Sequence, residues 1–314
     1  MAEIVTKATR ESFGEALRDL ANENPNIVVL DADLAASTKT ATFQKAHPER
    51  FFDCGIAEAN MVSIAAGLAA CGKIPFAASF AMFAAGRAYE QVRNSVGYPH
   101  LNVKIVGSHA GISVGEDGAT HQCCEDIALM RSIPGMVVLN PADHYEMKAA
   151  VKAAVEYDGP VYIRLGRLAV ESCNNNDDYR FELGKGITLR DGRDVTIMAT
   201  GLMVSEAVKA VKTLEAEGID ARLLDIHTIK PLDRDLVLKA ARETGRIITV
   251  EEHSVVGGLG EAVSSLLCEE CPVPVKKIGI YDVFGHSGPA KDLLKEFGLS
   301  AENIVKVTKE FIGR

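Results

Sequence analysis

The chain has 314 residues, a length that favours two domains of ordinary size. Hydrophobic residues make up 47% and charged residues 25% of it, which are typical globular values. The formal charge of −9 argues against binding to nucleic acid or to an anionic membrane surface. A local cluster of Arg and His could still bind an anionic substrate.

The cysteine count and the N-terminal segment indicate the compartment. Seven cysteines, an odd number without the spacing of a disulfide framework, favour a reducing environment. The N-terminal segment is charged and lacks the apolar core of a signal peptide. The apolar stretch over 61–86 is interrupted by Gly72 and Pro75, so we expect a buried helix, a turn and a strand there. We therefore predict a cytoplasmic protein with no membrane segment.

Strand and helix patterns alternate through the first half of the chain. Helices are predicted over 9–21, 57–70, 87–96, 123–132 and, after a cap in the segment Asn140–Asp143, up to Glu156. Strands are predicted over 26–30, 51–54, 74–79, 103–107, 136–139 and 161–165. This alternation predicts a doubly wound parallel sheet.

A polar stretch rich in helix breakers, over 171–180, is the best candidate for a linker. After it, strands are predicted over 194–200, 221–225, 246–251 and 275–280, and helices over 203–217, 233–244, 260–271, 290–297 and 301–312. We predict an α/β protein with a doubly wound parallel-sheet domain over 1–170, a linker over 171–184 and a smaller α/β domain over 185–314.

The most informative segment is the glycine-rich run GSHAGISVGEDGATHQ over 107–122. It places His109, Glu116, Asp117 and His121 directly after a predicted strand. In open α/β sheets ligands bind at the carboxyl ends of the strands. A core has no need for two imidazoles, two carboxylates and four glycines in one loop. We therefore expect this loop to form part of a site.

Two further motifs lie at the ends of predicted strands. In GIAEANM, Glu58 opens an apolar helix, where a carboxylate ordinarily just satisfies the helix dipole. Its apolar neighbours predict burial, however, and a buried acid needs a partner. No basic residue is nearby in the sequence, so a ligand nitrogen is the expected partner. Phe80 and Phe83 follow the next strand, where aromatic side chains can pack against a planar ligand ring.

Taken together, five blocks resemble the transketolase family in order and spacing: GIAEANM, SFAMF, GSHAGISVGEDGATHQ, SIPGMVVLNPAD and YIRLGR. The resemblance covers a pyrimidine-binding domain over about 1–167 and the C-terminal domain after it. It implies thiamine diphosphate chemistry, in which a two-carbon ketol unit moves from a ketose phosphate to an aldose phosphate.

The resemblance also implies roles for individual residues. Glu58 matches the glutamate that hydrogen-bonds N1′ of the aminopyrimidine and favours the imino tautomer that activates the cofactor. Phe80 and Phe83 match the aromatic residues against that ring. His109 and His121 match histidines that bind substrate hydroxyls and stabilise the developing alkoxide.

The remaining carried-over residues bind the substrate. Asp117 matches the aspartate that reads a sugar hydroxyl. Arg10 in ATRESFGEAL, Ser37 in DADLAAS and Arg167 in IRLGR match the group that holds the substrate phosphate, a task suited to the bidentate guanidinium. With His109 and His121 they complete the predicted substrate-binding set.

One part of the family pattern is missing. The diphosphate and metal module, a Gly-Asp-Gly followed by a distant Asn, does not occur in this sequence, and we predict no metal ligands in it. The resemblance then implies a separate N-terminal subunit that binds the diphosphate through Mg²⁺ or Ca²⁺, in an assembly of two chains of each kind. The start at Met1, just before the first helix, favours such a natural split.

Three other interpretations stay open. A deoxyxylulose phosphate synthase-like enzyme shares several of these blocks, although His109 and Glu116 fit transketolase better. The β subunit of a 2-oxo acid dehydrogenase has the right size, but the GEDGATHQ loop argues against it. A noncatalytic scaffold that kept the fold would have no need for Glu58, both loop histidines and the phosphate residues together. The physiological sugars are not identified by the sequence.

Overall fold

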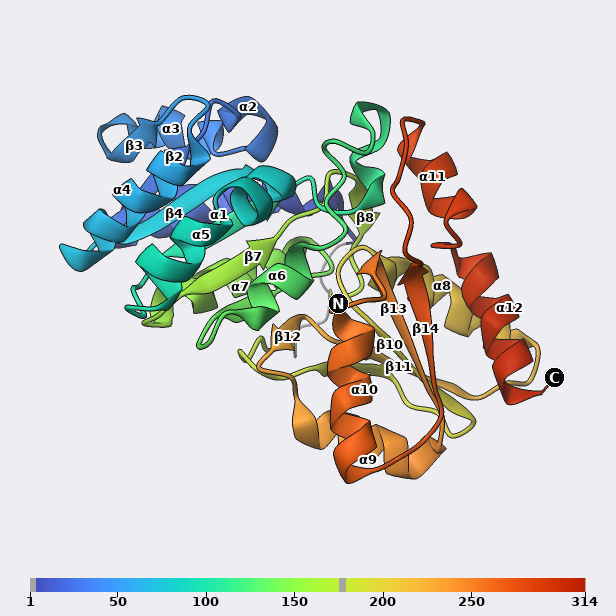
Figure 1. Ribbon diagram of the computed structural model, residues 1–314. Helices are drawn as coiled ribbons and strands as arrows, with labels where there is room; N and C mark the ends of the chain where they lie inside the picture. The colour runs from blue at the N-terminus through green and yellow to red at the C-terminus, as the bar shows by residue number, and fades with distance from the viewer. Residues whose placement is uncertain (1–3, 175–178, 314) are drawn as a thin grey trace.

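The computed structural model of the chain describes residues 4–174 and 179–313. It contains two largely parallel sheets, one from each half of the sequence, with helices on both faces of each (Figure 1). The predicted α/β class is therefore confirmed. The predicted linker over 171–184 includes residues 175–178, which lie outside the described residues. Across the described ranges, none of the helices combines the length and apolar character needed to span a bilayer.

The first sheet has the strand order β12-β6-β7-β5-β4-β2-β3. Its strands are β2 (Ile27–Asp31), β3 (Phe51–Asp53), β4 (Ile74–Phe80), β5 (Lys104–Ser108), β6 (Val137–Leu139), β7 (Val161–Arg164) and β12 (Thr228–Lys230). All of them pair in parallel except β12, which pairs antiparallel with β6. Strands such as β2 are apolar nearly throughout because helices cover both faces of the sheet.

The strand order fixes where a ligand can bind. From β2 the chain adds β3 on one side and then returns to add β4 on the other. This reversal leaves a crevice at the carboxyl ends of the strands, where ligands bind in open α/β sheets. The loops after β2, β3, β4, β5 and β7 all leave from that edge.

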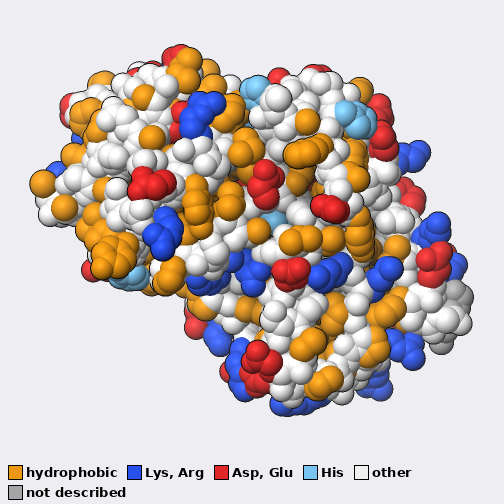
Figure 2. Space-filling model, viewed as in Figure 1, with side chains coloured by type: hydrophobic (Ala, Val, Ile, Leu, Met, Phe, Trp, Pro, Cys, Tyr) orange, Lys and Arg blue, Asp and Glu red, His pale blue; other side chains and the backbone are white. Residues whose placement is uncertain are grey.

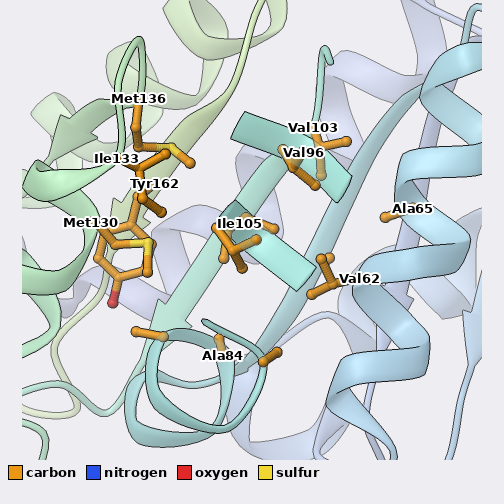
Figure 3. Packing of buried hydrophobic residues seen from close by; sticks show 14 of the residues in the cluster. Val62, Ala65, Ala84, Val96, Val103, Ile105, Met130, Ile133, Met136 and Tyr162 are labelled. Carbon is orange, nitrogen blue, oxygen red and sulfur yellow. The ribbon is translucent and has the colours of Figure 1, made fainter. Parts of the chain in front are cut away.

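Helices fill both faces of the first sheet. One face is covered by α1 (Thr9–Glu23) and α7 (His144–Glu156), and the other by α4 (Glu58–Ala70) and α6 (Asp126–Ser132). Figure 3 shows Val62 and Ala65 of α4 directed toward Ile105 of β5, and all three are fully buried. The predicted cap of α7 is confirmed, since the Asp143 side chain accepts a hydrogen bond from the Glu146 N–H.

Two predicted helices differ from the structure. The segment over 87–96 forms part of two π-helical stretches, η2 (Met82–Arg87) and η3 (Val92–Gly97), separated by α5 (Tyr89–Gln91). The bond from Ala88 N–H to the Phe83 carbonyl spans the five residues of a π turn. Helix α6 begins three residues later than predicted because Cys123 is bridged to Ala110 and held against the preceding loop.

The second sheet has the order β14-β13-β10-β11-β9, with only β9 antiparallel to its neighbour. Its strands are β9 (Ile187–Arg190), β10 (Val195–Ala199), β11 (Ala221–Asp225), β13 (Ile247–Ser254) and β14 (Val275–Ile280). Its helices are α8 (Met203–Ala216), α9 (Arg234–Thr244), α10 (Leu259–Glu270), α11 (Ala290–Glu296) and α12 (Ala301–Ile312). On the face seen in Figure 2, Lys and Arg side chains gather over the lower half, where this second sheet lies.

The two halves of the chain are joined in three dimensions. No strand was predicted between residues 225 and 246, but Thr228–Lys230 returns to the first sheet as its edge strand β12. Ile112 and Ala142 of the first half pack in the core of the second sheet. The remaining short elements are β1 (Thr6–Ala8) paired with β8 (Ala169–Glu171), α2 (Ala35–Thr38), α3 (Ala41–Ala46), η1 (Pro48–Arg50) and η4 (Ile112–Asp117).

Candidate active site

The predicted site residues come from five neighbouring strands of the first sheet. Ser37 follows β2, Glu58 follows β3, Phe80 ends β4, His109 follows β5 and Arg167 follows β7. Because parallel strands end at the same edge, residues up to 130 positions apart in the sequence reach one crevice. The structure thus places these residues at the edge where the sequence analysis expected a ligand.

Four aromatic and imidazole rings form a connected cluster at this edge. The Phe80 ring stacks on His109 with 4.0 Å between centroids, and Phe83 lies 5.9 Å from Phe80. His121 meets both phenylalanines edge-on, at 6.2 Å from Phe80 and 5.4 Å from Phe83. The aromatic residues predicted to bind the cofactor and the histidines predicted to bind substrate are therefore adjacent.

His109 is held in one orientation. Its Nε2 lies 3.2 Å from Arg10 Nη1 and its Nδ1 lies 2.9 Å from Ser108 Oγ. Its backbone has a φ of +56°, a conformation rare outside glycine and often found at functional sites. Burial, together with the charges of Arg10, Arg167 and Lys39, lowers the pKa of His109 to about 3. The imidazole is therefore neutral at physiological pH and can exchange hydrogen bonds with a hydroxyl group.

Three cations surround this histidine within a chain that is acidic overall. Arg10 also donates a 2.8 Å hydrogen bond to the carbonyl of Ser37. Arg167 donates to the Val114 carbonyl and to Glu116, the latter at 2.7 Å. Lys39 was not predicted from the sequence. Together these charges make a locally positive pocket, which suits a phosphate or another anionic group.

Asp117 and His121 occupy the far end of the same loop. Asp117 is exposed at the end of η4, and its carboxylate has no hydrogen bond or ion pair to any residue that the structure describes. The His121 Nδ1 lies 2.9 Å from Thr120 Oγ1. Both side chains are thus available for a ligand that enters over the ring cluster.

Glu58 is buried as predicted, and its carboxylate contacts an arginine that the sequence did not predict. Only 2% of Glu58 is exposed, and both of its carboxylate oxygens accept from Arg87 Nη1, at 3.0 and 2.9 Å. The Arg87 guanidinium lies 4.5 Å from the centroid of the Phe83 ring. No ligand nitrogen is needed to satisfy the acid, because an arginine 29 positions later reaches it. The sequence carried no local signal for this contact, because the two residues lie 29 positions apart.

A cavity of about 780 Å³ adjoins this pair, a volume ordinary for a small-ligand site. Met82, Phe83 and Arg87 line one wall, and the segment from Ile280 to Gly285 lines another. On that second wall Phe284 is 88% exposed. A second cavity, of about 610 Å³ between β8, α8 and α11, is lined by none of the predicted site residues.

This arrangement fits one end of the implied cofactor. A buried carboxylate, an aromatic face and an adjoining cavity suit the aminopyrimidine ring. The diphosphate end does not fit, because residues 4–174 and 179–313 contain no group of three or more His, Cys, Asp or Glu placed to hold a metal ion. Within the described residues, the groups predicted for the ring and for the substrate therefore lie together, and no such cluster lies among them.

Comparison with known proteins identifies a family for both halves of the chain. The sequence matches the pyrimidine-binding domain of transketolase over residues 5–172 and the transketolase C-terminal domain over residues 184–304. It is 51% identical to a putative transketolase C-terminal section from Methanocaldococcus jannaschii, covering 96% of this chain and 95% of that protein. It is 47% identical to a 6-deoxy-6-sulfo-D-fructose transketolase subunit from a Clostridium species, covering 97% and 94%.

Two further similarities concern length and structure. Human transketolase is 40% identical over 97% of this chain, which spans 49% of the human protein. A solved split-gene transketolase, described as an inactive β4 tetramer, superposes with a TM-score of 0.91 and 54% identity, covering 98% of this chain and 99% of that one. The motifs, the fold and these relatives lead to one conclusion: this chain belongs to the transketolase family.

Proposed function

We propose that this chain is the C-terminal subunit of a two-chain, thiamine diphosphate-dependent transketolase. It would transfer a two-carbon ketol unit from a ketose phosphate to an aldose phosphate, together with a separate N-terminal subunit. The observation that carries the proposal is the continuous cluster formed by the buried Glu58, the Phe80 and Phe83 rings, and the cationic pocket around His109.

In this proposal Phe80, Phe83 and Glu58 hold the aminopyrimidine. When bound, thiamine diphosphate supplies a thiazolium that accepts the electron pair released when the donor's carbon–carbon bond breaks. Glu58 holds a proton between its carboxylate and the ring nitrogen N1′, and its burial keeps water away from that hydrogen bond. Arg87 must give up at least one of its two contacts to make room for N1′.

His109 and His121 bind the substrate hydroxyls and the oxygen on which negative charge develops. The neutral state of His109 lets one ring nitrogen accept a hydrogen bond while the other donates. Arg10, Ser37 and Arg167 hold the terminal anionic group of the substrate. Asp117 forms a hydrogen bond with one of its hydroxyl groups. This division leaves the anionic end of the substrate near Arg10 and the reacting end near the Phe80 ring.

The proposed partner is an N-terminal transketolase subunit that binds the diphosphate through Mg²⁺ or Ca²⁺, with two copies of each chain in the assembly. Two observations support it: the family's diphosphate module does not occur in the sequence, and the related β4 tetramer is described as inactive. All seven cysteines are free thiols, in keeping with a cytoplasmic location.

Reconstitution tests this function. The purified chain is mixed with its N-terminal subunit, thiamine diphosphate and Mg²⁺, and ketol transfer from xylulose 5-phosphate to ribose 5-phosphate is measured. The complex should be active, the chain alone should turn over negligibly, and Glu58→Ala should abolish transfer. Equal transfer by wild type and Glu58→Ala would show that the role given to Glu58 is wrong. Activity with pyruvate as donor instead would point to the synthase or dehydrogenase alternatives.

A further inference from the structure

The loop that carries both substrate histidines is contacted by a carboxylate from the other sheet. Glu252 lies on β13 of the second sheet and is 2% exposed. Its Oε1 accepts a 2.6 Å hydrogen bond from the N–H of Ser113. Ser113 lies in η4, between His109 and His121. One buried side chain therefore bridges the second sheet and the centre of the histidine loop.

This carboxylate lies directly against the loop backbone at Gly111. Gly111 has a φ of +84°, which only glycine adopts easily. A Cβ atom at this position would also lie 2.4 Å from both Cδ and Oε1 of Glu252. Position 111 thus needs glycine for two separate reasons. The second reason exists only because Glu252 is directly behind the loop.

Glu252 is itself held by a buried polar network. Its backbone carbonyl accepts a 2.8 Å hydrogen bond from Arg164, the last residue of β7. Arg164 donates a second bond, also of 2.8 Å, to Asp126, and Tyr162 donates to the same Asp126 oxygen at 2.8 Å. Burial raises the pKa of Glu252, whereas the Arg164 charge and the Ser113 N–H favour its ionised form. The support behind the loop is therefore anchored in both sheets.

The loop is also held at its far end, by hydrogen bonds from Gln122. The Gln122 side chain donates to the carbonyls of Ile112 and His286, at 3.1 and 3.0 Å. A Cβ atom at Gly118 would lie 2.5 Å from Ser287 Oγ. In Figure 1 the green loop after β5 stands beside α11 of the second sheet, and η4 contacts that helix. The second sheet and its loops thus pack along the whole length of the histidine loop.

We propose that Glu252 is a positioning residue, through which the C-terminal sheet sets the geometry of the two substrate histidines. It touches neither substrate nor cofactor and acts through the Ser113 N–H. The kinetic part of this inference rests on the proposed function, because it takes His109 and His121 as substrate-binding groups. The structural part, that Glu252 orders the loop over 108–122, stands without it.

The neighbouring residue supplies a matched control. Glu251 is equally buried on the same strand, and its carboxylate accepts two backbone N–H groups, from Leu259 and Gly260. Both of those bonds stay within the second sheet and its helix α10. Glu251→Ala and Glu252→Ala therefore remove the same chemistry from adjacent positions, and only Glu252 faces the histidine loop.

The test combines hydrogen–deuterium exchange of the full chain with kinetics of the reconstituted complex. We expect Glu252→Ala to speed exchange over 108–122 and to lower kcat/KM for the sugar phosphates by roughly tenfold or more, since small misplacements of binding groups have large effects on rate. Glu252→Gln, which keeps an acceptor oxygen, should restore both. Glu251→Ala should leave exchange in this loop unchanged. Should the alanine variant fail to fold, Glu252→Asp, which draws the carboxylate back from Ser113, gives the same comparison.

Unchanged loop exchange in Glu252→Ala, or equal loop exchange in Glu251→Ala, would overturn the inference. Faster loop exchange with unchanged kcat/KM in an active complex would also overturn the positioning role. Failure of the proposed function gives a different result, because the wild-type complex would then show no ketol transfer. Hydrogen–deuterium exchange in the Glu251→Ala and Glu252→Ala variants would still show whether Glu252 orders the loop.

Discussion

Replacing Arg87 with alanine should tighten cofactor binding by the assembled enzyme. In the structure Arg87 contacts both oxygens of Glu58 and covers the Phe83 ring. These are two of the three residues proposed to hold the aminopyrimidine. The ring can only take its place if the guanidinium moves aside, so part of the binding free energy is used to separate Arg87 from its contacts.

The size of this effect follows from the exposure of the two groups. The Arg87 side chain is 51% exposed, so water screens its attraction to Glu58, and such an ion pair contributes about 1 kcal/mol or less. The stacking of the guanidinium on Phe83 adds about 0.5–1 kcal/mol at an exposed site. Losing both, about 0.5–2 kcal/mol in total, should lower the dissociation constant by roughly 2- to 30-fold, since about 1.4 kcal/mol corresponds to a factor of ten. The free chain should lose on the order of 1 kcal/mol of stability, because Glu58 is left buried without its partner.

The assay is calorimetric titration of the reconstituted apo complex with thiamine diphosphate and Mg²⁺. Arg93→Ala is the matched control, because Arg93 is an exposed arginine of the same segment that donates a hydrogen bond to its neighbour Asn94. The control should bind the cofactor like wild type. Weaker or unchanged binding by Arg87→Ala would refute the reasoning, and would mean that Arg87 stays on Glu58 in the working enzyme.

Two other predictions concern substrate binding and pH. Arg10→Ala should raise KM for both sugar phosphates by roughly 10- to 100-fold with a smaller change in kcat, because it removes a charge-assisted hydrogen bond made in ground and transition states alike. Steady-state kinetics check this against Arg18→Ala, which removes a partly exposed arginine from the same helix. Equal KM values for the two variants would contradict it. Burial, with the Asp143 carboxylate nearby, raises the pKa of Asp225 to about 7, so the folded chain keeps a proton that the unfolded chain releases near pH 4. The free energy of unfolding should therefore fall by an amount on the order of a few kcal/mol as pH rises from about 4 to about 7. Urea unfolding at pH 5 and pH 8 should show a smaller decline for Asp225→Asn than for wild type. Equal declines in the two proteins would contradict the prediction.

The parts of the molecule that were predicted from the sequence are those encoded locally. The cap at Asp143 and the glycine-rich loop with His109 and His121 each lie within a few residues. Glu58 stood out because a carboxylate began an apolar helix. Parallel strands all end at the same edge of a sheet. The predicted alternation of strands and helices was therefore enough to place these residues at one crevice.

The features that were missed depend on contacts between distant segments. Strand β12 joins the first sheet only through pairing with β6, some 90 residues earlier. Arg87, which contacts Glu58, is the last residue of a π-helical stretch, and a regular helical period does not predict such a stretch. Glu252 had no signal of its own, because its partner Ser113 lies 139 positions away, in the loop that follows β5 of the first sheet. Such pairs are fixed by packing and not by local pattern.

The central claim is that this chain supplies the acid that activates thiamine diphosphate. The most direct measurement is the exchange rate of the cofactor's C2 proton with deuterium, followed by NMR in the reconstituted complex without sugar substrates. Wild type should accelerate exchange strongly, and Glu58→Gln should lose about 10²- to 10⁴-fold, the usual worth of a positioned acid or base. Equal exchange rates with the cofactor bound in both proteins would contradict the claim.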